Sequence, residues 1–151
     1  MGYIENIRKK IGHDPIFMPA SGCILIQNNQ ILLQKRSDDG LWGLHGGALE
    51  FGENFNEALY REIKEEINIK PIKPILMKVY SGKDFYHVYP NGDMIYPIIA
   101  AFIVRDYEGV IQIDNNEVLE VKWFDLNNLP KNLFDVDKIM INDAIKYLKS
   151  I

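Results

Sequence analysis

The chain has 151 residues, with 47% hydrophobic and 25% charged side chains, a composition that is typical of a globular protein and predicts a single domain over residues 1–151. Its formal net charge of -4 argues against binding along a nucleic acid, because a protein that follows the phosphate backbone carries a basic face. A single cysteine, no signal peptide and no apolar run long enough for a bilayer predict a reduced, cytoplasmic setting without a membrane partner.

The first part of the chain predicts one short helix and a pair of strands. Apolar residues recur every three or four positions in residues 4–11, which is the spacing of an amphipathic helix. Two apolar runs within residues 17–36 flank Asn28 and Asn29, and this arrangement indicates a β-hairpin with an asparagine turn. A loop is predicted over residues 37–47.

The second half of the chain predicts further strands and a closing helix. Apolar runs over residues 75–81, 94–105, 110–113 and 118–124 are typical of strands. Apolar residues at helical spacing then follow Asp135, which is expected to cap the last helix. A sheet with one helix inserted early and another at its end predicts an α/β (α+β) fold, a layered α/β/α sandwich around a central mixed β-sheet.

Residues 54–68 predict a helix with clear start and stop signals. Asn54 can accept hydrogen bonds from the first free N–H groups while Glu57 reaches back, as in a capping box. Asn68 suits the left-handed conformation of a C-terminal cap, and Pro71 prevents the helix from continuing. The buried stripe of this helix is expected to consist of Phe55, Ala58, Leu59, Ile63 and Ile67.

Three acids of this helix, Glu62, Glu65 and Glu66, lie beside the apolar stripe and not opposite it, at about 100° per residue. Removing carboxylates from water costs free energy unless they are paired or bound to a cation. The pattern therefore predicts a divalent-metal site and chemistry on phosphate. The alternative, a solvated helix rich in Glu and Lys, fits Glu57 and Lys64 but does not explain these three acids.

The segment from Gly47 to Ile69 resembles the Nudix box, the signature of the Nudix hydrolase superfamily, and this resemblance implies the Nudix-like α/β/α sandwich. Two positions differ from the family pattern. Asn68 replaces the final glycine, and His45 stands where many relatives have proline before the paired glycines. The residues that match the box are Gly47, Glu53, Arg61, Glu62, Ile63, Glu65, Glu66 and Ile69.

The resemblance implies hydrolysis of a pyrophosphate bond in a nucleoside diphosphate linked to another moiety, with Mg²⁺ or Mn²⁺ required. Such substrates are nucleotide sugars, dinucleotides, CDP-alcohols and modified nucleoside triphosphates. Arg61 is implied to pair with Glu53 and to hold the cluster in place, a bidentate role that lysine would serve poorly. Relatives are often dimers, so a homodimer is a candidate assembly. The implied metal ligands are Glu62, Glu65, Glu66 and the backbone carbonyl of Gly46.

The sequence leaves the general base open. Glu117 is the first choice, because it lies at a loop-to-strand junction at a spacing like that of the family. Glu120 is the second choice, and Glu62 could act from within the box. For Glu117 and Glu120 the alternative is a solvated carboxylate at the edge of a strand.

Three positions are predicted to contact the substrate, and each has an alternative. Arg36 ends a strand shortly before the glycine loop and could reach a phosphate, or it could remain solvated. His45 could touch a phosphate, or it could simply replace a rigid loop residue. Tyr86 is one of four tyrosines after the box that could stack on a base, the alternatives being sheet packing and exposure.

Two other classes of protein compete with an enzyme. A ligand-sensing module would keep the fold and bind a nucleotide without useful turnover. Regulators of that kind usually carry an added DNA-binding segment, which is not evident in this sequence. A purely structural interaction protein would leave the acidic cluster unexplained. The complete set of box glutamates favours a catalyst.

Overall fold

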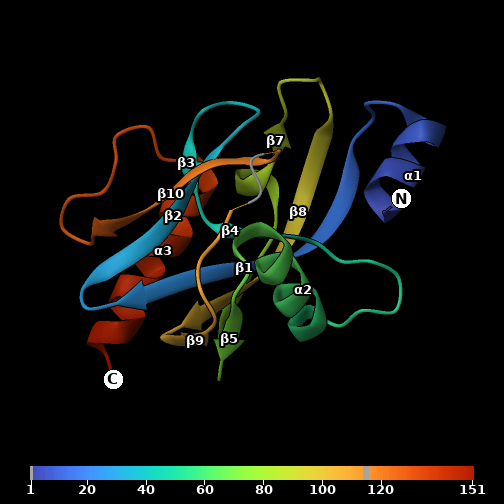
Figure 1. The fold of residues 1–151 in the computed structure, drawn as a ribbon. Helices are drawn as coiled ribbons and strands as arrows, with labels where there is room; N and C mark the ends of the chain where they lie inside the picture. Colours follow the sequence, from blue (N-terminus) through green and yellow to red (C-terminus); the bar gives the residue numbers. More distant parts are fainter. Residues whose placement is uncertain (1, 114–115) are drawn as a thin grey trace.

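The computed structural model describes residues 2–113 and 116–151 (Figure 1). Its helices are α1 (Tyr3–Ile11), α2 (Phe55–Ile67) and α3 (Asp135–Lys149), with a 3-10 turn η1 (Lys83–Phe85). Each of these helices is too short or too polar to cross a lipid bilayer. The strands are β1 (Ile16–Gln27), β2 (Gln30–Arg36), β3 (Trp42–Gly43), β4 (His45–Ala48), β5 (Lys70–Ile72), β6 (Ile75–Tyr80), β7 (His87–Val88), β8 (Met94–Val104), β9 (Asp106–Glu108) and β10 (Val118–Asp125).

The main sheet is mixed, as predicted. Its strands follow the order β10-β2-β1-β8-β6, and β3, β4 and β7 pair with β2, β1 and β8. β1 runs parallel to β8, whereas its hairpin partner β2 is antiparallel. The hairpin turns at Asn28 and Asn29, whose φ angles are 51° and 60°. Two consecutive left-handed residues give the turn whose twist matches antiparallel strands, and asparagine tolerates this conformation, so the predicted asparagine turn is confirmed.

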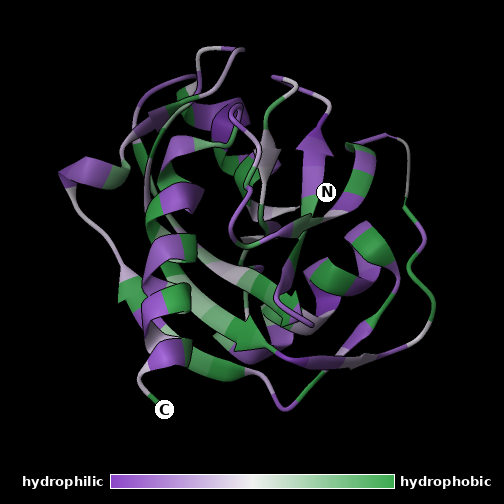
Figure 2. Cartoon of the chain, turned by 90° about the vertical axis from the view of Figure 1, so that its left-hand side faces the viewer, coloured by the Kyte–Doolittle hydropathy of each residue, from purple (hydrophilic) through white to green (hydrophobic). Residues whose placement is uncertain are grey.

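Two helices cover opposite faces of the sheet. Alternate residues of β1 face one helix or the other, because successive side chains of a strand point to opposite sides. Cys23 and Leu25 pack in the hydrophobic core that includes Ile63 of α2, and Ile24 packs in the core that includes Met140 of α3. Figure 1 shows α2 in front of the strands and α3 behind them, and Figure 2 shows the strands enclosed between the helices. The predicted α/β/α sandwich is confirmed.

The ends of α2 follow the signals in the sequence. The Asn54 side chain accepts a hydrogen bond from the Glu57 N–H at 2.8 Å, and the Glu57 side chain accepts one from the Asn54 N–H at 3.0 Å. Asn68 has a φ of 63°, and its N–H donates to the Lys64 carbonyl. The predicted capping box and left-handed cap are therefore both present.

The prediction of a loop over residues 37–47 is wrong in part, because β3 and β4 form within it. β4 pairs with β1 so that His45 lies opposite Cys23 and Gly46 lies opposite Gly22. Glycine backbones can join a ladder although they have no side-chain alternation that would predict a strand. This pairing brings the paired glycines to the centre of the sheet, next to α2.

Two smaller predictions also differ from the structure. Residues 110–113 contain no strand, because Gly109, with a φ of 103°, turns the chain away after β9. Asp135 does not cap α3. Phe134 occupies the cap position without a side-chain hydrogen bond, and Asp135 is the first helical residue, where its negative charge still favours the helix N-terminus.

Candidate active site

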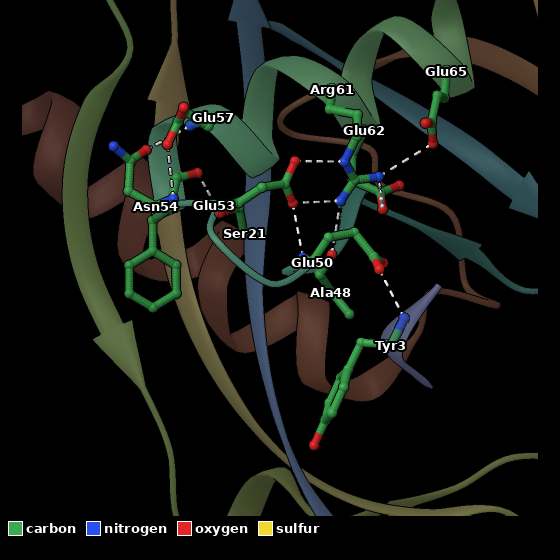
Figure 3. Close-up of polar contacts among 11 residues, drawn as sticks. Tyr3, Ser21, Ala48, Glu50, Glu53, Asn54, Glu57, Arg61, Glu62 and Glu65 are labelled. Carbon is green, nitrogen blue, oxygen red and sulfur yellow. Dashed lines mark hydrogen bonds and ion pairs between the residues drawn. The ribbon is translucent and has the colours of Figure 1, made fainter. Parts of the chain in front are cut away.

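Arg61 lies at the centre of the acidic cluster on α2 (Figure 3). Its Nε and Nη2 donate to the two carboxylate oxygens of Glu53 at 2.7 and 2.9 Å, and Nη2 also donates to the Ala48 carbonyl at 3.0 Å. Its Nη1 donates to Glu62 at 2.9 Å and to Glu65 at 3.3 Å. Two parallel bonds to one carboxylate require a planar guanidinium. The expected pairing of Arg61 with Glu53 is therefore present.

Glu53 connects this cluster to the turn that precedes the helix. Its carboxylate also accepts a hydrogen bond from the Glu50 N–H at 2.8 Å, and its own N–H donates to the Glu50 carbonyl at 3.0 Å. The hydrogen bond from Arg61 holds the pKa of the Glu53 carboxyl below its usual range. The ionised Glu53 carboxylate therefore stabilises both the turn at Glu50 and the position of Arg61.

Glu62 packs against the paired glycines of β4. A Cβ at position 47 would overlap the Glu62 carboxylate, so Gly47 leaves the space that this carboxylate fills. Burial raises the pKa of Glu62 to about 7, while the hydrogen bond from Arg61 lowers it and the charges of Glu65 and Glu117 raise it. A nearby cation would favour the charged form of this side chain.

Glu66 is the most buried acid of the cluster, with an exposed fraction of 8%. The Gly46 N–H donates to its Oε1 at 2.7 Å, and Gln34 Nε2 donates to its Oε2 at 2.9 Å. Burial raises the pKa of Glu66 to about 8, although these two hydrogen bonds oppose the shift, and the charges of Glu62 and Glu117 raise it further. Gly46 has a φ of 146° and a Cβ there would strike the β1 backbone, so only glycine fits.

The carboxylates of this cluster are the type of ligand that a divalent cation prefers, but their side chains are not arranged around a common point. Hard cations such as Mg²⁺ prefer carboxylate and carbonyl oxygens, and positive charge would relieve the repulsion among Glu62, Glu66 and Glu117. In residues 2–113 and 116–151, however, no three acidic, histidine or cysteine side chains are close enough together to hold a metal ion as they stand. The Glu65 side chain is 60% exposed and is turned toward Arg61.

A polar cleft beside Glu66, which we call the acidic cleft, brings Glu117 to the glutamate helix. Glu117 directly precedes β10, and the Ser37 N–H donates to its carbonyl at 3.1 Å. Glu120 is exposed on β10 opposite Lys35 and does not line this cleft. The first choice for the general base thus lies beside Glu66, and the second does not. The lining residues are Gln34, Arg36, Ser37, Asp38, Leu44, Gly46, Glu66, Tyr89 and Glu117.

A second cavity, which we call the aromatic cavity, opens beside the acidic cleft. Its cavity volume is about 140 Å³. It shares Arg36, Leu44, Gly46 and Tyr89 with the acidic cleft. Its other lining residues are Met18, Ala20, Ser21, Gly22, His45, Gly47, Phe85, His87, Ile95, Pro97, Ile99, Phe134, Val136, Asp137 and Met140.

Arg36 stands between the two cavities. Its guanidinium carbon lies 5.1 Å from the centre of the Phe134 ring and 5.7 Å from the centre of the Tyr89 ring. Its Nε and Nη2 donate to the two carboxylate oxygens of Asp38 at 2.9 and 2.7 Å. Arg36 therefore lies where it could contact a phosphate, but its guanidinium is already paired with Asp38 and packs against the rings of Tyr89 and Phe134.

Two polar residues of the aromatic cavity were not predicted from the sequence. Asp137, on the first turn of α3, is 9% exposed and accepts a hydrogen bond from the Leu44 N–H at 2.9 Å. Burial raises its pKa to about 6. The His87 ring packs edge-on against the rings of Tyr89 and Phe134, each with centroids 4.7 Å apart. An acid in the first turn of a helix is an ordinary feature, so no sequence signal marks Asp137 as a cavity residue.

Tyr86, which was predicted to stack on a base, lies outside both the acidic cleft and the aromatic cavity. Its ring packs against Tyr96 with centroids 4.8 Å apart and is partly exposed. Side chains alternate along the extended segment after η1, so His87 and Tyr89 face the cavity while Tyr86 does not line it. Of these tyrosines, Tyr89 has the position that the prediction assigned to Tyr86.

His45 lies within the sheet, with an exposed fraction of 1%. Its Nδ1 is 2.8 Å from Gln34 Oε1, and its Nε2 is buried with no hydrogen-bond partner among the residues that the structure describes. Burial lowers its pKa to about 4, so the ring is neutral at neutral pH. A neutral, buried imidazole does not attract a phosphate through charge, and this position does not support the expected phosphate contact.

Comparison with known proteins identifies the family. The family model described as NUDIX domain matches residues 16–143. An ADP-ribose pyrophosphatase from Methanocaldococcus jannaschii is 38% identical over 127 residues, which cover 82% of this chain and 70% of that protein. The nucleoside triphosphatase NudI from an Enterobacter species is 38% identical over 123 residues, which cover 73% of this chain and 86% of that protein.

Solved structures agree with this result. The MutT NUDIX hydrolase from Burkholderia pseudomallei has a TM-score of 0.72 at 25% identity and covers 85% of this chain and 98% of its own. The NUDIX domain of Shewanella oneidensis NrtR, solved with ADP ribose, has a TM-score of 0.71 at 21% identity and covers 98% of this chain and 99% of its own, a likeness of fold. Nudix hydrolases generally use divalent metal ions and act on small nucleotide substrates. The chain therefore belongs to the Nudix hydrolase family and is a Nudix-type pyrophosphohydrolase.

Proposed function

We propose that this chain hydrolyses the pyrophosphate bond of a nucleoside diphosphate linked to another moiety, with Mg²⁺ or Mn²⁺ as its cofactor. The observation that supports this proposal most is that the acidic cleft and the aromatic cavity adjoin, with Arg36, Leu44, Gly46 and Tyr89 in common. A flat base fits among aromatic rings, and a diphosphate fits among carboxylates that hold cations. A substrate bound across both would have its pyrophosphate beside the glutamates of the box.

The residues of the box and of the acidic cleft have different roles in the proposed hydrolysis. A divalent ion bound there supplies neutralisation of the diphosphate and activation of a water molecule. Glu117 faces the cleft and accepts the proton of the attacking water, with Glu62 as the alternative base. Glu53 and Arg61 hold the box in place and are positioning residues. The groups that hold the metal ions are the side chains of Glu62, Glu65 and Glu66 and the carbonyl of Gly46.

The reaction consumes one water molecule. Its oxygen bonds to one phosphorus of the pyrophosphate, the bond from that phosphorus to the bridging oxygen breaks, and the proton passes to the base. The products are two phosphate-bearing fragments, and the fragment that carries ¹⁸O after reaction in H₂¹⁸O identifies the phosphorus that is attacked.

ADP-ribose is the first substrate to test. The archaeal relative is named an ADP-ribose pyrophosphatase, and the NUDIX domain of NrtR was solved with ADP ribose. NudI, which is also 38% identical over its matched residues, is named a nucleoside triphosphatase, so other substrates must be tested as well. The panel therefore also includes other nucleotide sugars, dinucleotides, CDP-alcohols and modified nucleoside triphosphates.

The proposal extends to the setting of the reaction. We expect the partner to be a small nucleotide, not a nucleic acid, in agreement with the net charge of -4. We also expect one catalytic domain that acts in the cytoplasm, with a homodimer as the assembly to test by light scattering.

The experiment incubates the purified chain with each member of the panel and with Mg²⁺ or Mn²⁺, and identifies the products by mass spectrometry. We expect hydrolysis of at least one member that stops when the metal is chelated. Tight binding of one member without turnover would instead indicate a nucleotide-sensing module. The proposal would be refuted if no member of the panel is hydrolysed and none binds.

A pair of variants tests the site itself. Glu66→Gln should abolish turnover while the fold remains intact, because it removes a charge that holds metal. Glu108→Gln, the same chemical change on exposed β9, should keep wild-type turnover. Wild-type activity in Glu66→Gln would overturn the assignment of the metal site.

A further inference from the structure

Two polar side chains are buried in the sheet beside Glu66. Gln34, on β2, is 7% exposed, and His45, on β4, is 1% exposed. They connect to the acid in series: His45 Nδ1 lies 2.8 Å from Gln34 Oε1, and Gln34 Nε2 lies 2.9 Å from Glu66 Oε2. The second oxygen of Glu66 accepts the Gly46 N–H at 2.7 Å. Each carboxylate oxygen therefore receives one N–H from the sheet.

The series works in only one direction. When Glu66 is ionised, as it must be to bind a cation, its oxygens can only accept, so the Gln34 amide must turn its NH₂ group toward Glu66 and its oxygen toward His45. His45 must then carry its proton on Nδ1 and donate it. If the amide were reversed, its oxygen would face the carboxylate oxygen and repel it. His45 thus determines which end of Gln34 meets Glu66.

We propose that Gln34 and His45 are positioning residues that hold the Glu66 carboxylate in its metal-binding orientation, a role that rests on the proposed metal-dependent function. With both oxygens restrained, Glu66 keeps its remaining lone pairs directed toward the acidic cleft. The ion then binds a preformed ligand and does not have to order a mobile one. Partners that hydrogen-bond a metal ligand typically change metal affinity by about 10–100-fold when they are removed.

Two observations separate this role from ordinary core packing. Burying an amide and an imidazole costs free energy, which an apolar pair would avoid. The buried His45 ring makes a side-chain hydrogen bond to Gln34, while burial lowers the pKa of the ring and the Leu32 backbone raises it, so the contact with Gln34 contributes to offsetting the cost of burial.

The experiment measures Mn²⁺ affinity by isothermal titration calorimetry on the full chain, together with kcat as a function of Mn²⁺ concentration. Gln34→Met removes both bonds while keeping a similar shape, and we expect Mn²⁺ affinity to fall by about 10–100-fold. His45→Phe removes only the donor, and we expect a fall of about tenfold. In both variants the Mn²⁺ concentration that gives half-maximal kcat should rise in step with the loss of Mn²⁺ affinity.

Two variants serve as matched controls. In His45→Asn the amide nitrogen takes the place of Nδ1 and can still donate to Gln34, so we expect Mn²⁺ affinity close to that of the wild type. Gln27→Met makes the same change as Gln34→Met on β1, where the Gln27 side chain donates to the carbonyl of the exposed Arg105, and it should not alter Mn²⁺ affinity. Melting temperatures without metal report whether each variant folds. If Gln34→Met does not fold, the comparison of His45→Phe with His45→Asn decides.

Three outcomes would count against the inference, and they can be told apart. Wild-type Mn²⁺ affinity in Gln34→Met or in His45→Phe would overturn it while leaving the proposed function intact. Equal losses in His45→Asn and His45→Phe would show that the ring volume matters and the donor does not. If the wild type binds no Mn²⁺ even with a nucleotide present, the proposed function fails and the inference fails with it.

Discussion

Arg61 and Glu53 are joined by two parallel hydrogen bonds of 2.7 and 2.9 Å, although Glu53 precedes α2 and Arg61 lies in its middle. The same guanidinium reaches Glu62 and the Ala48 carbonyl of β4. One arginine therefore ties together the turn before the helix, the helix and the glycine strand. Arg61 therefore helps to place Glu53, Glu62 and Glu65 relative to the sheet, whereas Glu66 is held by Gly46 and Gln34.

Replacing Arg61 with lysine should loosen this arrangement. Lysine keeps the charge but cannot make the two parallel bonds. Because the side chain is partly exposed, we expect a loss of about 1–2 kcal/mol in the free energy of unfolding. A fall in kcat/KM should accompany it, since Glu62 loses its anchor. Urea unfolding and steady-state kinetics measure both effects. Arg105→Lys, at an exposed position, should change neither quantity, and an equal effect of the two variants would contradict the role of Arg61.

The left-handed cap of α2 predicts how Asn68 responds to substitution. At a φ of 63° glycine is as well suited as asparagine, so Asn68→Gly should change the free energy of unfolding by less than about 0.5 kcal/mol. Asn68→Ala should lose about 1 kcal/mol, because a Cβ disfavours this conformation. Thermal or urea unfolding of the two variants provides the measurement. If alanine proves as stable as glycine, the left-handed conformation is not what position 68 requires.

The buried carboxyl of Asp137 should make stability depend on pH. Its pKa is about 6 in the folded protein, against 3.8 for an ordinary aspartate. A raised pKa means that the folded state binds the proton more tightly than the unfolded state. The contribution of the protonated Asp137 carboxyl to the free energy of unfolding is therefore complete below pH 3.8 and is lost as the pH rises through 6.

Asp137→Asn removes this titration but keeps an oxygen for the Leu44 N–H. We expect the wild type to lose on the order of 2–3 kcal/mol relative to this variant between pH 4 and pH 7. Urea unfolding of both proteins at several pH values measures the difference. A constant difference across this range would contradict the buried titration.

The aromatic cavity predicts opposite results for two neighbouring tyrosines. Tyr89 lines the cavity, so Tyr89→Ala should raise KM for a nucleotide substrate by about tenfold, in agreement with the roughly 1–3 kcal/mol that an aromatic side chain contributes by stacking on a base. Tyr86 faces away, so Tyr86→Ala should change KM by less than about twofold. Steady-state kinetics on the best substrate of the panel makes the comparison. The reverse pattern would place the base on the other side of β7.

Substitutions of Glu117 and Glu120 should also have clearly different effects on kcat. If Glu117 accepts the proton of the attacking water, Glu117→Gln should lower kcat by about 10²–10⁴-fold with little change in KM. Glu120→Gln should have a small effect, because this side chain lies outside the acidic cleft. Similar kcat values for the two variants would point to Glu62 as the base. Single-turnover measurements exclude product release as the limiting step.

The sequence alone determined the features that depend on neighbouring residues. The capping box at Asn54, the left-handed cap at Asn68 and the asparagine turn at Asn28 all form between residues that lie close together in the chain, so local chemistry was sufficient. The order of strands and helices and the apolar stripe of α2 were likewise sufficient for the layered sandwich. The spacing of the acids on one helix turn was sufficient for the acidic cluster.

Only the tertiary structure decided which side chains meet across the sheet. β4 forms because glycine backbones pair with β1, and no side-chain pattern records such a pairing. Tyr89 faces the aromatic cavity and Tyr86 does not, because a change of one residue in register reverses every side chain of an extended segment. Asp137 and Gln34 are far from the box in sequence and become part of the site only when α3 and β2 pack beside it. Their roles follow from burial and contact, which are properties of the folded chain.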